Sequence, residues 1–404
     1  MTQKYTKKEL HLITFTLILG SIIVNSALDM NIPVLPDIAK TFFTDDTLVQ
    51  LSVSAGFYGT ASAGLVYGPL ADVLGRKRML IAGLTIFCVA SIWCTFSVNI
   101  YNLIVARFFQ GVGTVASSVL WLTIVNDIFK GKELVGLLGV FSTTISLTLA
   151  TAPVVGANIA NIFGWRGIFG FLSLASLLQV FLIYKNIPET LPPEARKPVR
   201  ARTILKNYKK IFSSLYFIKC GALNGSVMGA YIGYISVASF YYMQEMGMSQ
   251  NMFVVHQFVP VVIYSISAWL SRHVVKHMDL RLIFVFGIGA MLTHLAIFTL
   301  FAVFGDPKVI TASYCLFSLA SPFLTGVVTT VAMNYFPRMG GTSSSAFTTM
   351  RQLSTALTIS FFTVMYNDNF ITIYLAQIGI AVMILFLGYW IYTKATKTFN
   401  VHES

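Results

Sequence analysis

Charged side chains inside long apolar stretches are the first candidates for chemistry in this sequence. Asp29 continues an almost entirely apolar segment that begins at Leu12, and Arg107 lies within another apolar run. An aspartate in a hydrocarbon environment costs roughly 2.5–3.5 kcal/mol on insertion scales, so such residues usually face a protein interior and have a function. We therefore expect Asp29 to exchange a proton in a water-accessible cavity, with Arg107 adjusting how readily the carboxyl group releases it.

Asp29 and Arg107 are predicted to lie at matching depths. Each is about five or six residues from the expected outer end of its helix, which corresponds to roughly 8–9 Å. Gln110, three residues after Arg107, can share a helix face with it and hydrogen-bond across the cavity. The alternative is a static, buried ion pair that only fixes helix packing.

Two further cations lie within apolar runs in the second half of the chain, Lys219 and Arg351. Each is a candidate for binding an anionic or zwitterionic group of a substrate. The alternative is that they extend to the inner interface or bind helix-end carbonyls. With three buried cations and one buried carboxylate, the predicted substrate is neutral, zwitterionic or acidic.

Polar and aromatic residues near these charges are predicted to line the same cavity. Asn25 is one turn before Asp29, and Tyr58, Tyr231 and Tyr234 lie in other apolar segments. The alternative for the tyrosines is packing against other aromatic rings or at the membrane interfaces.

The histidines and cysteines are predicted to be structural. His256 and His294 have no partner close in sequence, which favours polar residues satisfied in helix contacts. The four cysteines show no metal-ligand spacing and are expected to be small buried residues rather than redox or metal groups. No metal and no cofactor are expected, and the proton motive force would supply the energy.

The elements that position these residues are predicted to be membrane-spanning helices. Of the 404 residues, 56% are hydrophobic and only 11% are charged. A soluble domain carries about 25% charged residues, so this composition indicates an all-α membrane protein. The predicted spans are 12–34, 48–70, 79–97, 101–125, 134–160, 167–184, 213–242, 251–271, 282–304, 309–335, 342–365 and 370–393.

The basic residues predict the orientation of these twelve spans. If the N-terminus is cytoplasmic, the inner connections hold most of the Lys and Arg, above all the proline-containing linker 185–210. The outer connections then hold only Lys40, Arg166 and Lys308. This bias places both termini in the cytoplasm and explains the net charge of +13 without nucleic acid. The expected domains are an N-terminal bundle 1–185, a basic linker 186–212 and a C-terminal bundle 213–404.

Several motifs resemble one family of membrane transporters. G-P-L-A-D-V-L-G-R-K-R, from Gly68 to Arg78, resembles the loop motif between the second and third helices of the major facilitator superfamily. A-R-F-F-Q-G-V-G, from Ala106, resembles that superfamily's R-x-x-Q-G motif. A-P-V-V-G-A, from Ala152, resembles the G-P-x-x-G-G motif of proton-driven antiporters, with alanine replacing two glycines.

Two more segments resemble the Bcr/CflA-type drug-resistance and efflux transporters within that superfamily. They are L-D-M-N-I-P-V-L-P, from Leu28, and N-Y-F-P-R-M-G-G-T-S-S-S-A, from Asn334. Some multidrug relatives have a second acidic residue about two turns before the position of Asp29, where this chain has Ser21. Asp29 is therefore the one acidic candidate in the first helix.

The resemblance implies a fold, a mechanism and a location. It implies two six-helix bundles with pseudo-two-fold symmetry, alternating access, and proton-coupled export of a drug, metabolite or siderophore. It implies a monomer in the bacterial inner membrane, with membrane lipid, protons and the small molecule as partners. The residues implied in conformational gating are Gly68, Asp72, Gly75, Arg76, Lys77, Pro153 and Gly156. Arg76 and Lys77 are expected to pair with acidic groups or helix-end carbonyls across the interface between the halves.

Other functions are possible for a chain with this pattern of apolar helices. An importer of the same fold would use proton symport of an anionic or zwitterionic solute. A receptor or scaffold would not transport at all. An enzyme is not expected, because no hydrolase or metalloprotease motif lies in or beside the spans.

Overall fold

The long apolar runs form helices in a computed structural model that describes residues 5–192, 201–274, 277–302, 306–336, 339–367 and 369–399. Counting the two parts of α6 separately, the long helices among these residues match the twelve predicted spans one for one. The helices are α1 (Lys7–Asp29), α2 (Leu35–Phe42), α3 (Asp46–Leu74), α4 (Arg76–Thr95), α5 (Ile100–Ile128), α6 (Gly131–Asn186), α7 (Ala201–Phe212), α8 (Leu215–Phe240), α9 (Gln250–Val274), α10 (Leu280–Ala302), α11 (Pro307–Tyr335), α12 (Gly340–Met365) and α13 (Phe370–Phe399).

The first span is shorter than predicted. We predicted one helix over 12–34, but α1 ends at Asp29, and a 3₁₀ turn, η1 (Ile32–Val34), leads into α2. Proline explains the break, because Pro33 has no backbone N–H and disfavours helical geometry at the residue before it. Asp29 is therefore the last residue of its helix and not an interior one.

The fifth and sixth spans join at Gly164, which has φ 68°. This is the left-handed region, which glycine adopts without a steric penalty. The predicted linker contains an element that we did not predict, the basic helix α7, whose buried residues Tyr208 and Ile211 are three apart. Residues 193–200 of the predicted linker lie outside the described residues.

Eight stretches of the described chain are long and apolar enough to cross a membrane by length and composition. One of them, Gly136–Asn186, contains most of α6 on both sides of Gly164. α3, α8 and α12 are as long but richer in Gly, Ser and Thr. Such residues are typical of closely packed helices inside membrane proteins.

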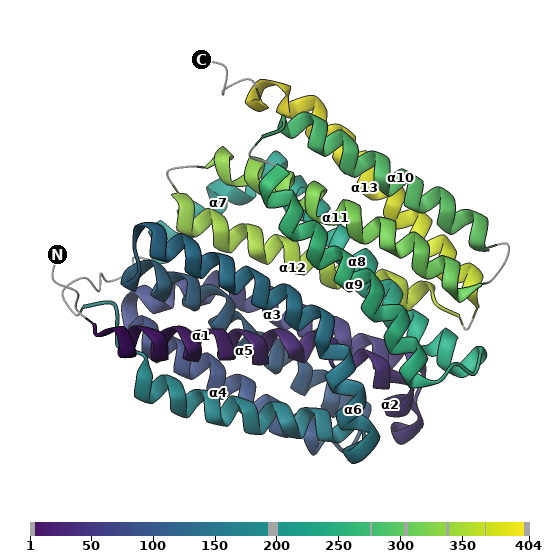
Figure 1. The fold of residues 1–404 in the computed structure, drawn as a ribbon, viewed down its shortest axis with the longest axis horizontal. Helices are drawn as coiled ribbons and strands as arrows, with labels where there is room; N and C mark the ends of the chain where they lie inside the picture. The colour runs from purple at the N-terminus through teal and green to yellow at the C-terminus, as the bar shows by residue number, and fades with distance from the viewer. Residues whose placement is uncertain are drawn as a thin grey trace. The chain divides into compact units, whose positions relative to one another are not determined.

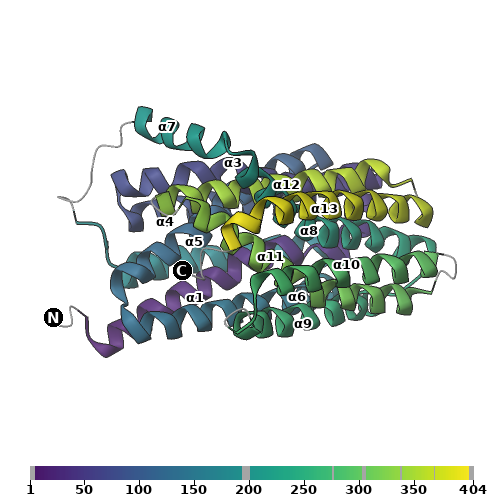
Figure 2. The ribbon, with the colours of Figure 1, turned by 90° about the horizontal axis from the view of Figure 1, so that it is seen from above.

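The helices group into two compact units. Unit 1 consists of residues 1–31 and 55–207, and unit 2 of residues 32–54 and 208–404. In unit 1, α4 packs against α5 and α6, and α1 packs against α6 (Figure 1). In unit 2, α8 packs against α12, α13 and α11 (Figure 2). These units do not follow the predicted boundaries throughout. Residues 32–54 group with unit 2, where η1 and α2 contact α8, and the predicted linker 186–212 is divided at 207 between the two units.

Candidate functional site

Asp29 lies buried at the C-terminal end of α1, with 7% of its surface exposed. Arg107 on α5 is its electrostatic neighbour, as the sequence predicted. The described residues nevertheless include no hydrogen bond or ion pair to the Asp29 carboxyl group. A helix C-terminus carries partial negative charge, so a carboxylate there depends on a nearby cation such as Arg107.

The hydrogen bonds of Arg107 go to atoms on either side of Asp29. Its Nη1 donates to Ala27 O at 3.0 Å and to Gln110 Oε1 at 2.6 Å, and its Nη2 donates to Asn31 Oδ1 at 3.4 Å. The guanidinium of Arg107 is thus fixed near the Asp29 carboxyl group without donating a hydrogen bond to it. Gln110 shares a helix face with Arg107, as predicted, and accepts a hydrogen bond from it, whereas no direct ion pair between Arg107 and Asp29 is found among the described residues.

Gln110 connects Arg107 to the next helix. It is 2% exposed, and its Nε2 donates to Ser91 Oγ on α4 at 2.8 Å. Ser91 Oγ in turn donates to Phe87 O at 2.7 Å. A buried chain of polar groups satisfied in this way fixes the orientation of the arginine.

Small residues let the backbones approach closely around this arginine. A Cβ on Gly56 of α3 would lie 3.8 Å from Arg107 Nη2, and one on Gly111 would lie 1.9 Å from Gly56 O. A Cβ on Gly156 of α6 would lie 2.1 Å from Met30 O. Gly156 therefore packs against Met30 at the end of α1, the residue after Asp29, and Pro153, three residues earlier in α6, is buried.

The other two residues predicted to line the cavity in unit 1 are half-buried. Asn25 Nδ2 donates to Ser21 O at 2.7 Å, one turn earlier in α1. Tyr58 lies on α3, two residues after Gly56. Substrate binding by either residue remains a prediction.

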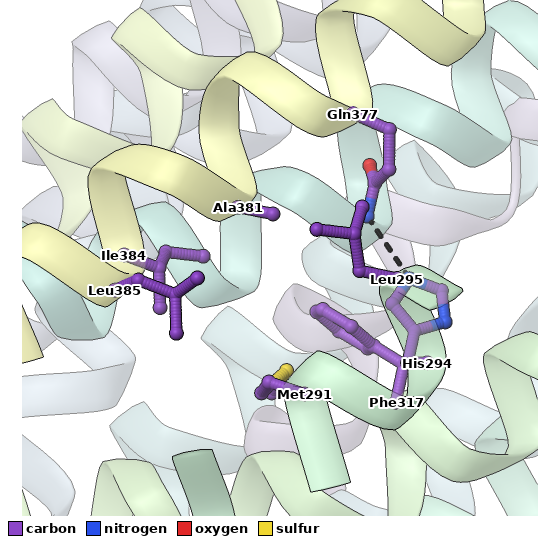
Figure 3. Close-up of a pocket in the computed structure, with 8 residues that line it drawn as sticks. All are labelled: Met291, His294, Leu295, Phe317, Gln377, Ala381, Ile384 and Leu385. Carbon is purple, nitrogen blue, oxygen red and sulfur yellow. Dashed lines mark hydrogen bonds between the residues drawn. The ribbon is translucent and has the colours of Figure 1, made fainter. Parts of the chain in front are cut away.

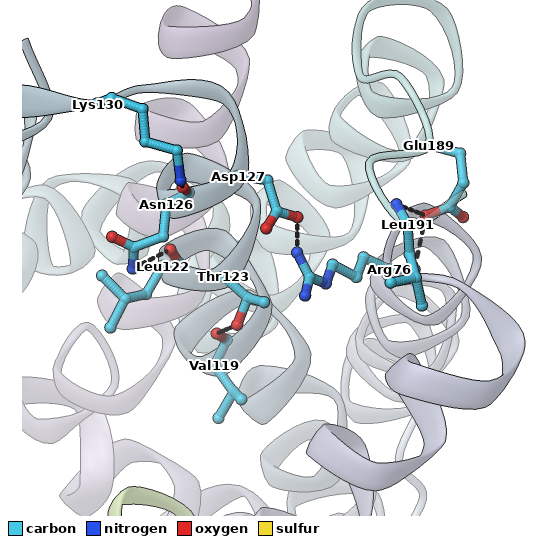
Figure 4. Close-up of polar contacts among 9 residues, drawn as sticks. All are labelled: Arg76, Val119, Leu122, Thr123, Asn126, Asp127, Lys130, Glu189 and Leu191. Carbon is cyan, nitrogen blue, oxygen red and sulfur yellow. Dashed lines mark hydrogen bonds and ion pairs between the residues drawn. The ribbon is translucent and has the colours of Figure 1, made fainter. Parts of the chain in front are cut away.

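The loop motif between α3 and α4 contacts residues at the ends of α5 and α6. Gly75 has φ 102° and precedes α4, a conformation that only glycine adopts readily. Arg76 forms an ion pair with Asp127 of α5, and its backbone N–H donates to Glu189 Oε1 at 2.9 Å (Figure 4). Gly68 is half-buried in the last turns of α3, where Asp72 is exposed.

The partners of this motif correct one expectation. Lys77 Nζ donates to Tyr184 O at 2.7 Å, near the C-terminal end of α6. An acidic group and a helix-end carbonyl are therefore the partners, as predicted. Both belong to unit 1, however, and we had expected partners in the other half of the chain.

Lys219 of α8 lies against aromatic rings. Its Nζ is 3.6 Å from the centroid of the Trp390 ring and 5.9 Å from that of Phe386, both on α13. A cation over an indole face is stabilised by the ring quadrupole. The structure thus gives Lys219 a partner that we did not predict, and its role toward a substrate remains a prediction.

The two tyrosines predicted to line the cavity in unit 2 differ. Tyr231 is half-buried and donates from its hydroxyl to Gln257 O of α9 at 3.2 Å. Tyr234 is 3% exposed, and its ring stacks on that of Tyr314 with 3.9 Å between the ring centroids. Its hydroxyl shares a hydrogen bond with that of Tyr242. Other aromatic rings therefore cover Tyr234, which is the packing arrangement given as the alternative, and substrate binding by this residue remains a prediction.

Arg351 lies in the middle of α12 and is half-buried. Its electrostatic neighbour is the phenol of Tyr264 on α9. Its own carbonyl lies against α8, where a Cβ on Gly225 would come within 2.2 Å of it.

His256 and His294 are both hydrogen-bonded, in agreement with the structural role expected for them. His256 Nδ1 lies 2.6 Å from Thr311 Oγ1. His294 Nδ1 lies 2.9 Å from Ser313 O, and its Nε2 lies 3.2 Å from Gln377 Nε2, beside a small apolar pocket between α10, α11 and α13 (Figure 3). The neutral tautomer that donates to Ser313 and accepts from Gln377 satisfies both ring nitrogens.

Sequence reasoning missed Asn31, Ser91, Asp127 and Glu189. Asn31 and Ser91 are short polar residues without charge, so hydrophobic patterning does not single them out. Asp127 and Glu189 were visible as acidic residues at predicted inner ends of spans, and the basic motif needed such partners. No cluster of residues that could hold a metal ion is found among the described residues.

A family model of the Major Facilitator Superfamily matches residues 17–359. A bicyclomycin resistance protein homolog of Haemophilus influenzae is 25% identical over 390 residues, covering 94% of this chain and 96% of that protein. An uncharacterized MFS-type transporter, YdgK, of Bacillus subtilis is 32% identical over 255 residues, 63% of each chain. Among solved structures, a D-xylose-proton symporter superposes with a TM-score of 0.75 at 16% identity, covering 94% of this chain and 97% of that one.

Proposed function

The chain belongs to the Major Facilitator Superfamily and is a multi-pass membrane transporter, and from this premise we propose that it exports small molecules in exchange for protons, with Asp29 as the proton site. The similarity to the bicyclomycin resistance homolog over almost the whole chain confirms the resemblance to Bcr/CflA-type transporters. The family assignment also confirms that the protein is not an enzyme. Relatives include proteins named for multidrug and chloramphenicol resistance, which favours export over import.

The observation that carries this proposal is that the Asp29 carboxyl group is buried near a cation but not hydrogen-bonded to it. Its carboxyl group is buried, and the hydrogen bonds of the adjacent Arg107 go to Ala27, Gln110 and Asn31 instead. In a static ion pair, the N–H groups of Arg107 would donate to the Asp29 carboxylate. A buried carboxyl group whose cation is near but engaged elsewhere can accept a proton and release it when the surroundings change.

The proposed cycle uses two conformations of one cavity. In the state open to the outside, Asp29 takes up a proton and the substrate leaves; in the state open to the cytoplasm, the proton leaves and substrate binds. Proton entry supplies about 2.3 kcal/mol per charge for each 100 mV of membrane potential. We place the protein in the bacterial inner membrane as a monomer with both termini in the cytoplasm, and Asn25, Tyr58, Gln110 and Tyr231 in the cavity.

The experiment is proton-driven transport by Asp29→Asn in proteoliposomes, with a drug or metabolite that stabilises the purified protein as the cargo. We expect Asp29→Asn to bind this cargo but to lose accumulation driven by a pH gradient. Asp29→Glu should retain part of it. Asp37→Asn, which alters the next carboxylate along the chain on α2, is the matched control and should transport normally. Unimpaired coupled transport by Asp29→Asn would remove this residue from the mechanism.

Two outcomes would favour the alternatives. Accumulation of the cargo along with protons, in vesicles of the opposite orientation, would make the protein a symporter. Binding without any flux of cargo or protons would make it a receptor or scaffold.

A further inference from the structure

Arg351 is a half-buried cation that the proposed proton exchange leaves unused. It is eleven residues from the start of α12 at Gly340, or about 16 Å along the helix. Its distance from the end of the helix, at Met365, is about 21 Å. A guanidinium near the middle of a membrane-length helix is costly and normally has a partner or a function.

No acidic residue in the described part of unit 2 supplies that partner. The ion pair found among the described residues is in unit 1, between Arg76 and Asp127. The described carboxylates of unit 2 lie in helix-end turns or connections, and they are Asp37, Asp45, Asp46, Glu245, Asp279 and Asp306. No hydrogen bond from the Arg351 guanidinium to a described residue is found either, although the side chain is only partly exposed.

The surroundings of Arg351 hold it in place. α12 packs against α8 at Gly225, and Thr355 Oγ1 donates both to Gly225 O at 3.0 Å and to Arg351 O at 2.9 Å. The backbone that carries the guanidinium therefore has no room to shift toward α8. A fixed backbone position preorganises a binding group and lowers the entropic cost of binding.

The electrostatic neighbour of Arg351 comes from another helix of unit 2. It is the phenol of Tyr264 on α9, and α9 is joined to α12 through α11 and α8, since α12 packs on α8, α8 on α11, and α11 on α9. The cation of α12 and a phenol of α9 therefore lie close enough to act on one ligand.

We propose that Arg351 and Tyr264 form the subsite that binds a carboxylate group of the transported molecule. A guanidinium presents paired N–H donors that match the two oxygens of a carboxylate, and a phenol adds a third donor. The arriving carboxylate supplies the counter-charge that unit 2 lacks at this depth. Lys219 does not compete for it, because its ammonium group lies on the Trp390 ring.

This inference rests on the proposed transport function and names the substrate class, carboxylate-bearing organic molecules. It separates the tasks of two charged residues: Asp29 carries the proton and Arg351 holds the substrate anion. The two assignments can therefore fail independently.

The test is binding of matched probes to the purified full-length protein without any proton gradient. The probes are carboxylates with apolar bodies, 4-phenylbutyrate, benzoate and octanoate, each paired with its neutral amide. We expect at least one carboxylate to raise the melting temperature while its amide does not. Arg351→Gln should weaken that binding by about tenfold or more, and Arg351→Lys should weaken it less.

Lys308→Gln is the matched control, because it removes an exposed cation of unit 2 at the start of α11, and it should bind the carboxylate as wild type does. Modification of Arg351 by phenylglyoxal, located by mass spectrometry, gives a second readout on the wild-type protein. The carboxylate should protect Arg351 from modification and the amide should not.

Several results would overturn the proposal. The proposal is wrong if carboxylates and amides change the melting temperature equally, or if no carboxylate changes it. It is also wrong if Arg351→Gln binds the carboxylate as wild type does. Asp29→Asn should bind the carboxylate normally. If Asp29→Asn also transports normally while Arg351→Gln loses binding, the assignment of the proton site is wrong and the carboxylate subsite is supported.

Discussion

At the residue scale, the arrangement around Asp29 depends on where the donors of Arg107 point. Three acceptors, Ala27 O, Gln110 Oε1 and Asn31 Oδ1, take hydrogen bonds from the guanidinium. Because Gln110 is itself held by Ser91, the arginine is fixed by unit 1 whether or not Asp29 carries a charge. A cation held independently of its neighbouring carboxylate is what a reversible proton site needs.

Removing the amide of Gln110 is expected to destabilise unit 1. Gln110→Leu leaves Arg107 Nη1 without one of its acceptors, and hydrogen bonds to charged groups contribute about 1.5–3 kcal/mol. The melting temperature of the purified protein should therefore fall clearly. Ser91→Ala removes only the far end of the chain of hydrogen bonds, a contribution of about 0.5–1.5 kcal/mol to stability, and should lower the melting temperature less. Equal melting temperatures of wild type and Gln110→Leu would contradict the role of Gln110 in holding Arg107.

At the element scale, unit 2 is organised by a stripe of glycines on α8. Gly221, Gly225, Gly229 and Gly233 recur every four residues, and a Cβ on each would come within 2.7 Å of an atom of α12. Such spacing allows two membrane helices to pack with their backbones in near contact. Packing of α8 on α12 therefore sets the position of Arg351.

Filling one position of this stripe is expected to separate the two helices. Gly225→Ala places a Cβ 2.2 Å from Arg351 O, a backbone atom that cannot move alone, and overpacking of this kind costs about 1–3 kcal/mol. Gly326→Ala on α11 is the control, because a Cβ there meets nothing within 4 Å. It should leave stability unchanged or raise it by up to about 1 kcal/mol through helix propensity. Thermal unfolding in detergent measures both, and equal effects would argue against close packing at Gly225.

At the scale of the whole molecule, the distribution of Lys and Arg predicts which ends of the helices face the cytoplasm. Phe43, after α2, is 97% exposed on a connection with few basic residues. Lys206 is exposed on the basic helix α7. The positive-inside bias places the first outside and the second in the cytoplasm.

Labelling of single cysteines is expected to reproduce this orientation. In a variant without the four native cysteines, Phe43→Cys should react with a membrane-impermeant maleimide in intact cells. Lys206→Cys should react only after the cells are permeabilised. Labelling of Lys206→Cys in intact cells would reverse the predicted topology.

Fold class, family and the charged residues of interest follow from the amino-acid sequence. Long apolar runs predict spanning helices without knowledge of their neighbours, because the hydrocarbon thickness fixes their length. The same cost of burying charge singles out Asp29, Arg107 and Arg351.

The partners of these residues become visible only when the helices are packed together. It gave Arg107 hydrogen bonds to Ala27 and Asn31 rather than to Asp29, placed Lys219 on Trp390, and buried Tyr234 among aromatic rings. The physical reason is that hydrogen bonds and ring contacts between helices depend on the rotation and separation of each pair. These follow from packing at glycines such as Gly56, Gly156 and Gly225, which hydropathy does not encode.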